Sequence, residues 1–263
     1  MILKKRKTVS RLFDPKKMLL SENSSFPTRE AYKSLRTNVL FSLPGSDSKC
    51  IGVVSANRGE GKSTIAINLA ISFAQANKKV IVVDCDMRLP TVAAKIGIEA
   101  KPGLSNYLAG SDDIQSHLIQ RVSEYGIDVL ASGDIPPDPT ALLGSQQMDN
   151  LIVLLKEYYD YVILDFPPVT IVTDAVILAK QVDGYLVVVR HNLSEFKKLK
   201  ETFRQLEFSE AKVLGVVYNG KGSRGKGYYR KSGGYYYYDD YYQKTPAGDH
   251  AKSDKEASMH PNE

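Results

Sequence analysis

The chain has 263 residues, 43% of them hydrophobic, and a formal net charge of +5, which suits one large domain or two small ones with an ordinary buried core. No apolar run approaches the roughly 18 residues of a membrane-spanning helix, and no apolar segment follows the basic start, so the sequence predicts neither a membrane span nor a secretory signal. The two cysteines, Cys50 and Cys85, have no metal-binding spacing, so we expect free thiols in a reducing cytoplasm and no disulfide scaffold.

Residues 1–27 are basic and polar, and we interpret them as a loose N-terminal arm. The run Lys4–Lys7 is either a solvated arm or a segment that is attracted to anionic lipid or an acidic partner. A helix is then predicted to begin at Thr28, with Glu30 in its first turn. Apolar residues recur at helical spacing along one face of this helix: Ala31, Leu35, Val39 and Leu43.

From Cys50 to Asn219, short β-branched runs alternate with amphipathic helices. The runs are apolar on consecutive residues, which indicates strands that are buried on both faces of a parallel sheet. The expected strands are Ile51–Val54, Val80–Val83, Ile127–Leu130, Tyr161–Leu164, Leu186–Val189 and Val213–Val217. Between the last two, Ser194 can cap a helix whose apolar side begins at Phe196. The pattern predicts an α/β domain, a doubly wound and mostly parallel sheet flanked by helices, with ligands bound beyond the C-terminal ends of the strands.

The first strand runs into residues 55–64, which read SANRGEGKST and lead into a helix. Glycines let backbone N–H groups turn around phosphate oxygens, and the helix N-terminus adds a positive dipole. Lys62 would reach the β- and γ-phosphates, and the Ser63 hydroxyl would bind Mg²⁺. The usual first glycine is Ala56 here, and a glycine turn that merely caps a helix is the alternative. The predicted ATP-binding residues of this P-loop are Arg58, Gly59, Glu60, Gly61, Lys62, Ser63 and Thr64.

Carboxylates follow two further strands, at Asp84 and Asp86 and at Asp165. At the ends of buried strands they would face the phosphate site, although polar turns are the alternative. We expect Asp165 to hold Mg²⁺ or its water, with Ser63, Asp84 and Asp86 also near the metal. Together with Lys62, Asp84 and Asp86 are the predicted catalytic residues, with Asp84 taking the proton from an attacking hydroxyl. The roles of these two aspartates could be exchanged.

Two polar residues near this edge are harder to assign. Asn219 could contact the adenine of a nucleotide, and a turn residue is the alternative. Asp174 is interpreted as a helix-start residue rather than a ligand.

Residues 220–263 are predicted to be disordered, because the chain from Asn219 to His250 contains no Val, Ile, Leu, Met or Phe. The segment holds eight of the 16 tyrosines, at Tyr228, Tyr229, Tyr235, Tyr236, Tyr237, Tyr238, Tyr241 and Tyr242. These are either a low-complexity surface that could stack on RNA bases or phosphate acceptors. At about −1.5 to −2 per phosphate, eight modified tyrosines would add roughly −12 to −16 and reverse the sign of the net charge.

Together these residues resemble the bacterial tyrosine kinases that control capsule and exopolysaccharide synthesis, the cytoplasmic CpsD/CapB group. The resemblance runs from about Glu30 to Tyr242 and rests on four motifs in order. They are the P-loop at residues 55–64, a D-x-D-x-R motif at Asp84, Asp86 and Arg88, a D-x-x-P motif at Asp165 and Pro168, and the terminal tyrosine cluster. It implies a MinD/ParA-like P-loop kinase domain over residues 28–219, Mg²⁺ and ATP as cofactors, and autophosphorylation of the tail between subunits.

The resemblance also implies partners. In the family, an E-x-x-R-x-x-R helix joins subunits into a ring, and Glu30, Lys33 and Arg36 take those positions here. Lys33 keeps the charge of an arginine but loses its planar fork, and ordinary i,i+3 pairs on a solvated helix face are the alternative. The family further implies a separate membrane activator of the polysaccharide co-polymerase type, a cognate tyrosine phosphatase, and a cytoplasmic location at the inner face of the cell membrane. No nucleic acid is expected.

Two other functions fit part of the pattern. An ATPase switch of the MinD/ParA type shares the fold, but such proteins usually carry a lysine at the position of Asn57 and have no need of eight tail tyrosines. A nucleotide-gated scaffold could use the tail to bind partners without phosphoryl transfer.

Overall fold

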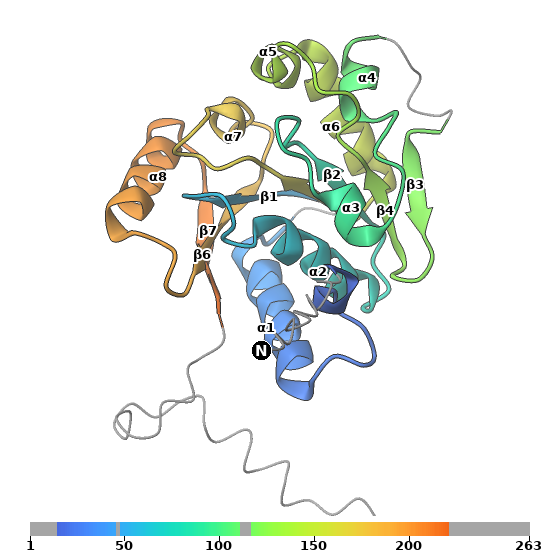
Figure 1. Cartoon of the computed structure of the whole chain (residues 1–263), viewed down its shortest axis with the longest axis vertical. Helices are drawn as coiled ribbons and strands as arrows, with labels where there is room; N and C mark the ends of the chain where they lie inside the picture. The colour runs from blue at the N-terminus through green and yellow to red at the C-terminus, as the bar shows by residue number, and fades with distance from the viewer. Residues whose placement is uncertain (1–14, 46–47, 111–116, 221–263) are drawn as a thin grey trace, which may run out of the picture. The chain divides into compact units, whose positions relative to one another are not determined.

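The computed structural model describes residues 15–45, 48–110 and 117–220, and Figure 1 shows how their helices and strands are arranged. The chain divides into two units, residues 1–221 and 222–263, and the fold described below belongs to the first. The predicted disordered tail and its tyrosines lie outside the described residues.

The middle layer of the fold is a seven-stranded sheet. Its strands are Lys49–Ser55 (β1), Val80–Asp84 (β2), Ile119–Val122 (β3), Ile127–Leu130 (β4), Tyr161–Asp165 (β5), Gly184–Arg190 (β6) and Val213–Asn219 (β7). They lie in the order β3-β4-β2-β5-β1-β6-β7. All neighbouring pairs are parallel except β3 with β4. This is the predicted, mostly parallel α/β sheet.

The sequence predicts six of these strands because each contains a mainly apolar run, which Asp128 interrupts in β4. β1, β2 and β5 are buried along their whole length, as parallel strands covered on both faces should be. The remaining strand, β3, reads IQRV and is only partly buried. Its short length and its two polar residues provide no apolar run, which is why the sequence does not predict it.

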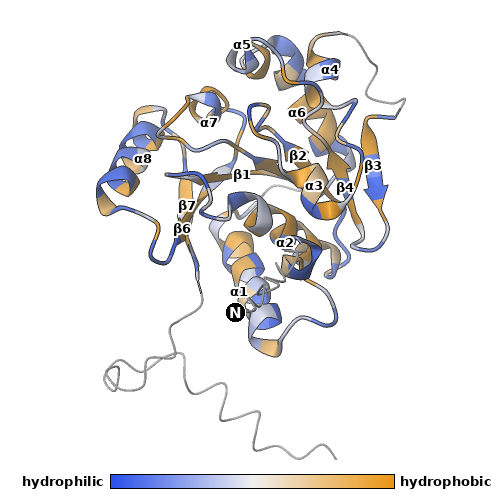
Figure 2. Ribbon diagram, viewed as in Figure 1, coloured by the Kyte–Doolittle hydropathy of each residue, from blue (hydrophilic) through white to orange (hydrophobic). Residues whose placement is uncertain are grey.

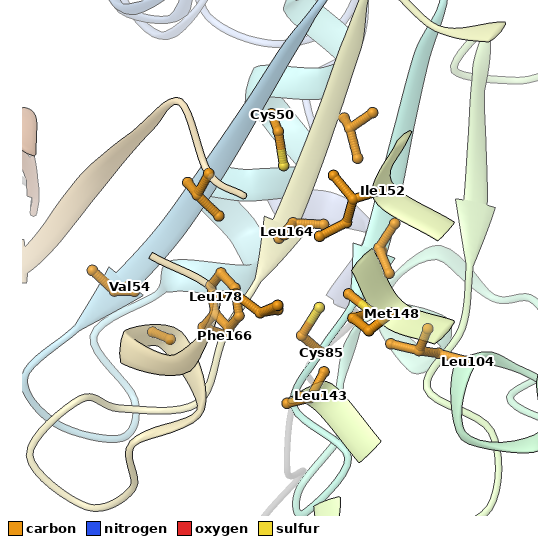
Figure 3. Close-up of a cluster of buried hydrophobic side chains, with 14 of the residues drawn as sticks. Cys50, Val54, Cys85, Leu104, Leu143, Met148, Ile152, Leu164, Phe166 and Leu178 are labelled. Carbon is orange, nitrogen blue, oxygen red and sulfur yellow. The ribbon is translucent and has the colours of Figure 1, made fainter. Parts of the chain in front are cut away.

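Helices cover both faces of the sheet, and their bounds are Phe26–Ser42 (α1), Lys62–Ala74 (α2), Val92–Ile96 (α3), Leu104–Leu108 (α4), Pro139–Leu143 (α5), Gln146–Tyr158 (α6), Asp174–Ile177 (α7) and Phe196–Phe208 (α8). Residues of α1, α2 and α3 share one buried apolar cluster with one side of the strands. Residues of α4 to α8 share a second cluster with the other side, part of which is drawn in Figure 3 around Phe166, Met148 and Leu143. Figure 2 shows the corresponding pattern, with apolar strands between helices whose outer sides are largely hydrophilic.

The N-terminal segment differs from the predicted loose arm. Residues Pro15–Met18 form a short 3-10 helix, and Leu19 and Leu20 are buried against α2. The Leu20 N–H donates to Oδ1 of Asn68 at 2.7 Å, while the Asn68 amide donates to the Met18 carbonyl at 3.0 Å. Two leucines and one buried amide partner are enough to hold this stretch, although its overall composition is polar. Residues 1–14 lie outside the described part.

Two predicted helix starts are also corrected. α1 begins at Phe26 rather than Thr28, because Ser25 is its N-cap and accepts from the Thr28 N–H, and Glu30 lies beyond the first turn. α8 has Glu195 at its N-cap with no side-chain cap bond. Ser194 therefore does not cap α8, because its hydroxyl is used elsewhere, as described below.

Two negative predictions concern membrane spans and disulfides. In the described ranges, none of the helices combines the length and the apolar character needed to cross a bilayer. Cys50 and Cys85 are both buried free thiols, as predicted.

The Asn68 side chain is expected to be a main support of the N-terminal segment. Its amide also donates to the Tyr32 hydroxyl at 2.9 Å, so Asn68→Ala breaks three hydrogen bonds, one buried and two partly buried. We expect the free energy of unfolding to fall by about 2–3 kcal/mol in urea denaturation. Asn150→Ala, which removes one exposed bond to Gln146 on α6, should change it by less than about 0.5 kcal/mol. Equal effects of the two substitutions would contradict this role.

Candidate active site

The carboxyl ends of β1, β2 and β5 meet at one edge of the sheet. β5 lies between β1 and β2, and Asp165 at its end is in register with Val53 of β1 on one side and Asp84 of β2 on the other. The loop after β1 is the predicted P-loop. The sheet order therefore brings the predicted carboxylates beside the predicted phosphate loop.

The P-loop has a backbone that only glycine accommodates at its end. Gly59 and Gly61 have φ values of 78° and 97°, in the left-handed region. A Cβ on Gly61 would also lie 2.1 Å from the amide nitrogen of Asn219. Gly61 caps α2 without any side-chain cap bond, so the first N–H groups of α2 are available to an anion such as a phosphate.

A buried carboxylate braces the P-loop from behind. Glu60 is fully buried, and its side chain accepts from the Asn57 N–H at 2.9 Å and from the Ser194 hydroxyl at 2.5 Å. The Glu60 side chain is thus engaged inside the loop, and only its backbone is left for a nucleotide. Arg190 donates to the Gly59 carbonyl at 2.6 Å.

Asn219 donates to the Glu60 carbonyl at 2.8 Å and therefore lies against the P-loop. Sequence reasoning misses Ser194 and Arg190 in this role. The available signal was their position at the carboxyl end of a parallel strand, because Arg190 ends β6 and Ser194 lies four residues later, at the edge where the P-loop lies.

Lys62 lies among carboxylates that come from the two neighbouring strands. Its Nζ is 3.0 Å from Oδ2 of Asp86 and 3.9 Å from Oδ1 of Asp165. Burial lowers the pKa of Lys62, but the charges of Asp165 and Asp86 outweigh it and the net shift is upward. Lys62 is therefore protonated, and its ammonium group lies beside two carboxyl groups.

Asp165 is the least satisfied polar group of this site. Its side chain is fully buried, and neither carboxylate oxygen has a hydrogen bond of good geometry in the part of the chain that the structure describes. Burial raises the pKa of Asp165, and the charge of Lys62 and the nearby Ser63 hydroxyl only partly oppose this. A buried carboxylate with such weak donors is costly, so the position favours a cation or its bound water.

The residues present fit a magnesium ion that arrives with a nucleotide. Within the described ranges, no group of three or more His, Cys, Asp or Glu side chains is arranged to hold a metal. Mg²⁺ is commonly held by one or two carboxylates together with substrate phosphates rather than by a cage of protein ligands. Asp165 offers carboxylate oxygens, and the hydroxyl of Ser63, the second residue of α2, lies nearby and accepts from Thr91 at 2.9 Å.

Asp84 and Asp86 have different surroundings. Asp84 is fully buried and accepts from the backbone N–H groups of Asp86, Thr91 and Val92 at 3.1, 3.2 and 3.1 Å. Burial and the charge of Asp165 raise the pKa of Asp84, although the Val92 N–H opposes the shift. Asp86 accepts from the Leu89 N–H at 3.1 Å through Oδ1, and its Oδ2 faces Lys62. Asp84 thus anchors the start of α3, whereas among the described residues one oxygen of Asp86 has Lys62 alone as its partner.

The motif residue Arg88 belongs to a second polar cluster. It donates to the Thr140 hydroxyl at 2.8 Å and pairs with Asp174 at 3.4 Å, and Thr140 donates to Asp174 at 2.8 Å. Asp174 is the first residue of α7, as predicted, and is fully buried. Its pairing with Arg88, 86 positions away, has no signal in a single sequence.

The three predicted oligomerisation residues are engaged within this chain. Lys33 pairs with Glu30 at 2.7 Å, the i,i+3 arrangement named as the alternative. Arg36 donates to the Ser72 carbonyl of α2 and to the Ser72 hydroxyl. Arg58 is exposed on the P-loop, Thr64 is buried in α2, and the tail tyrosines lie outside the described residues.

Comparison with known proteins places this geometry among named relatives. A family model described as an AAA domain matches residues 48–209. The tyrosine-protein kinase YwqD of Bacillus subtilis (strain 168) is 38% identical over 192 residues, which are 73% of this chain and 81% of that protein. The tyrosine-protein kinase CpsD of Streptococcus agalactiae serotype III (strain NEM316) is 35% identical over 193 residues, or 73% and 82% of the two chains.

Solved structures agree with these relatives. The kinase domain of the Escherichia coli tyrosine kinase ETK superposes with a TM-score of 0.72 at 31% identity, over 79% of this chain and 80% of that one. The chimerical protein CapA2B2 gives a TM-score of 0.71 at 37% identity, over 75% and 87%. MinD of Pyrococcus horikoshii OT3, at 20% identity and a TM-score of 0.57 over 68% and 72%, shares the fold.

The unsatisfied state of Asp165 predicts a pH-dependent effect of Asp165→Asn. The pKa of Asp165 is raised in the folded protein, so the folded state becomes less stable relative to the unfolded state as the pH rises through that pKa. Without nucleotide or Mg²⁺, we expect Asp165→Asn to stabilise the chain by about 1–3 kcal/mol at pH 8 and by less at pH 5, measured by urea denaturation. The control Glu157→Gln, on the exposed side of α6, should show no such difference. Destabilisation by Asp165→Asn at both pH values would contradict this account of the site.

Proposed function

The chain belongs to the bacterial protein-tyrosine kinases, and on that premise we propose that it uses Mg²⁺ and ATP to phosphorylate its own tyrosine cluster, between subunits, in the control of capsule or exopolysaccharide synthesis. Kinase activity follows from the family. The acceptor tyrosines, the assembly and the biological role are the proposed part.

The observation that carries the proposal is the position of Lys62 between Asp86 and Asp165 at the start of α2. Bound Mg·ATP supplies the transferable phosphoryl group together with a cation that offsets its charge. Lys62 would turn from the carboxylates to the β- and γ-phosphates, beside the backbone N–H groups of the P-loop. Ser63 and Asp165 would hold the metal directly or through water, which would give the oxygens of Asp165 better partners than they have within the chain.

The surroundings of the two aspartates favour Asp86 as the group that accepts the proton of the incoming tyrosine. Oδ2 of Asp86 is released when Lys62 moves to the phosphates, whereas the oxygens of Asp84 stay bound to backbone N–H groups. In this assignment Asp84 positions the loop that carries Asp86. This assignment exchanges the roles of Asp84 and Asp86, an alternative that the sequence leaves open.

The proposed assembly uses α1. Arg36 fixes α1 on α2 through Ser72, and the exposed pair of Glu30 and Lys33 is left to meet a neighbouring subunit. A ring of this kind would be loosened by the roughly 12–16 negative charges that full tail phosphorylation adds to each chain. A tyrosine phosphatase would reverse the change.

A separate membrane activator is the remaining partner that we propose. The chain spans 26% of the putative tyrosine-protein kinase EpsB of Ralstonia nicotianae and 30% of AmsA of Erwinia amylovora, so those relatives carry the kinase region within a much longer protein. We propose that a separate membrane protein takes the place of the additional regions of these longer relatives. Binding to that protein would keep this kinase at the inner face of the cell membrane, on the cytoplasmic side.

The test is mass spectrometry of the purified chain after incubation with Mg·ATP, with and without an activator tail. We expect phosphate on Tyr228–Tyr242 in the wild type, and a loss of about 100-fold or more in Lys62→Met, because the lysine stabilises transferring charge. Lys78→Met, in the exposed loop after α2, serves as the matched control. ATP hydrolysis with unmodified tyrosines under every condition would replace the proposal by an ATPase switch of the MinD/ParA type.

A further inference from the structure

Exposed aliphatic side chains lie on four separate loops at the same edge of the sheet as the P-loop. Each follows a parallel strand at the carboxyl edge of the sheet, after β2, β4, β5 and β6. The residues, with their exposed fractions, are Leu89 (50%), Ile135 (66%), Ile171 (52%) and Leu193 (42%). We name these four residues the aliphatic rim.

The opposite edge of the sheet lacks this feature in the part of the chain that the structure describes. Its connecting loops contain no large exposed hydrophobic side chain, and they comprise residues 75–79, 123–126, 159–160, 178–183 and 209–212. The exposed hydrophobic residues near that edge lie in the last turns of helices, and they are Leu40, Phe41, Tyr158 and Phe208. Exposed apolar side chains therefore occur near both edges, but those that lie in connecting loops are at the edge that carries the candidate active site.

The rim is held in place by polar contacts between its loops. The cluster of Arg88, Thr140 and Asp174 links three chain segments. Arg88 adjoins Leu89, Asp174 lies three residues after Ile171, and Thr140 lies five residues after Ile135. These three rim residues are thus carried by, or lie next to, segments that are fixed to one another.

The rim also reaches the P-loop. The Thr170 hydroxyl, next to Ile171, donates to the carbonyl of Ala56 at 2.6 Å. The Leu193 side chain lies 3.8 Å from the position of a Cβ on Gly59. Ile171 and Leu193, two of the four rim residues, therefore lie next to the loop at which phosphoryl transfer is proposed.

We propose that the aliphatic rim is the docking surface for the tyrosine-rich segment of a second copy of this chain, and that it binds the aromatic rings that flank the accepting tyrosine. The inference rests on the proposed function and adds the residues that select the acceptor. The rim side chains have no hydrogen-bonding groups, so they can contact the apolar faces of aromatic rings but cannot bind hydroxyl groups. The accepting tyrosine is thereby recognised through its neighbours.

The composition of the segment supports this occupant. Between Asn219 and His250 the chain has no Val, Ile, Leu, Met or Phe, so its tyrosines are the large apolar surface that it can offer. Tyr235–Tyr238 and Tyr241–Tyr242 place several rings within eight residues. The segment also leaves the fold at the same edge, because β7 runs parallel to β6 and ends at Asn219. In a ring of copies, each chain would thus extend its tyrosine-rich segment from this edge and bind the segment of a neighbouring copy at the same edge.

A binding assay tests the rim without relying on phosphoryl transfer. The full chain carries serine at its eight tail tyrosines, so that its own rings do not compete, and the probe is a fluorescent peptide of residues 226–244 with phenylalanine in place of tyrosine. We expect the peptide to bind, and the double variant Ile135→Ser, Ile171→Ser to raise its Kd about tenfold, because two aliphatic contacts are lost. Val153→Ser, with an exposed fraction of 61% on α6, is the matched control, and the same peptide with serines should not bind.

A transfer assay then connects binding with activity. The enzyme carries the serine tail with or without the two rim substitutions, and the acceptor is the full chain with Lys62→Met and its own tyrosines. We expect kcat/KM for the acceptor to fall about tenfold in the rim variant while the KM for ATP changes less than about twofold. The control substitution Val153→Ser should leave both unchanged.

The outcomes separate the two proposals. Unchanged peptide binding and unchanged kcat/KM in the rim variant would overturn the rim while leaving the kinase function intact. A rim variant that loses self-association but binds the peptide normally would also overturn it, since the rim would then be a contact between folded domains. Rim-dependent peptide binding without any transfer by the wild-type enzyme would instead support the docking surface and refute tail phosphorylation.

Discussion

The ion pair between Lys62 and Asp86, with Asp165 close by, is the interaction on which the candidate site depends. The three side chains come from the start of α2, the loop after β2 and the end of β5, and they meet only because β5 lies between β1 and β2 in the sheet. The left-handed glycine at position 61 turns the chain so that α2 begins with Lys62 at this edge. The strand order and Gly61 together determine where the ammonium group of Lys62 lies relative to the carboxylates.

The charges around Lys62 are unbalanced in a way that favours a ligand. Asp84, Asp86 and Asp165 surround a single buried lysine, and burial raises the pKa of Asp84 and Asp165. Without a ligand, keeping these carboxylates ionised is therefore costly, and the start of α2 has no side-chain cap for its first N–H groups. A cation with attached phosphates satisfies both features. The fold tolerates this local instability because two large apolar clusters cover the faces of the sheet.

Much of the fold and the centre of the site follow from local sequence patterns. Continuous apolar runs mark β1 and β5 because parallel strands are buried on both faces, and Gly61-Lys62 marks the P-loop because no other residue type fits that backbone. Three features are not predictable in the same way. They are the strand β3, the burial of the segment around Leu20 and the hydrogen bond of Ser194 to the P-loop. They depend on partners far away in the sequence, such as Asn68 for Leu20 and Glu60 for Ser194. The pairing of Arg88 with Asp174, which fixes the loops of the aliphatic rim, has the same origin.

The most direct test of this account is a crystal structure of the chain with Mg²⁺ and a non-hydrolysable ATP analogue. We expect Lys62 to leave Asp86 and contact the β- and γ-phosphates, and the carboxylate of Asp165 to bind the metal or one of its waters. We also expect Glu60 to keep its contacts with Asn57 and Ser194, since it braces the loop and does not bind the nucleotide. A complex in which Lys62 remains on Asp86 and Asp165 remains without a partner would contradict the central claim.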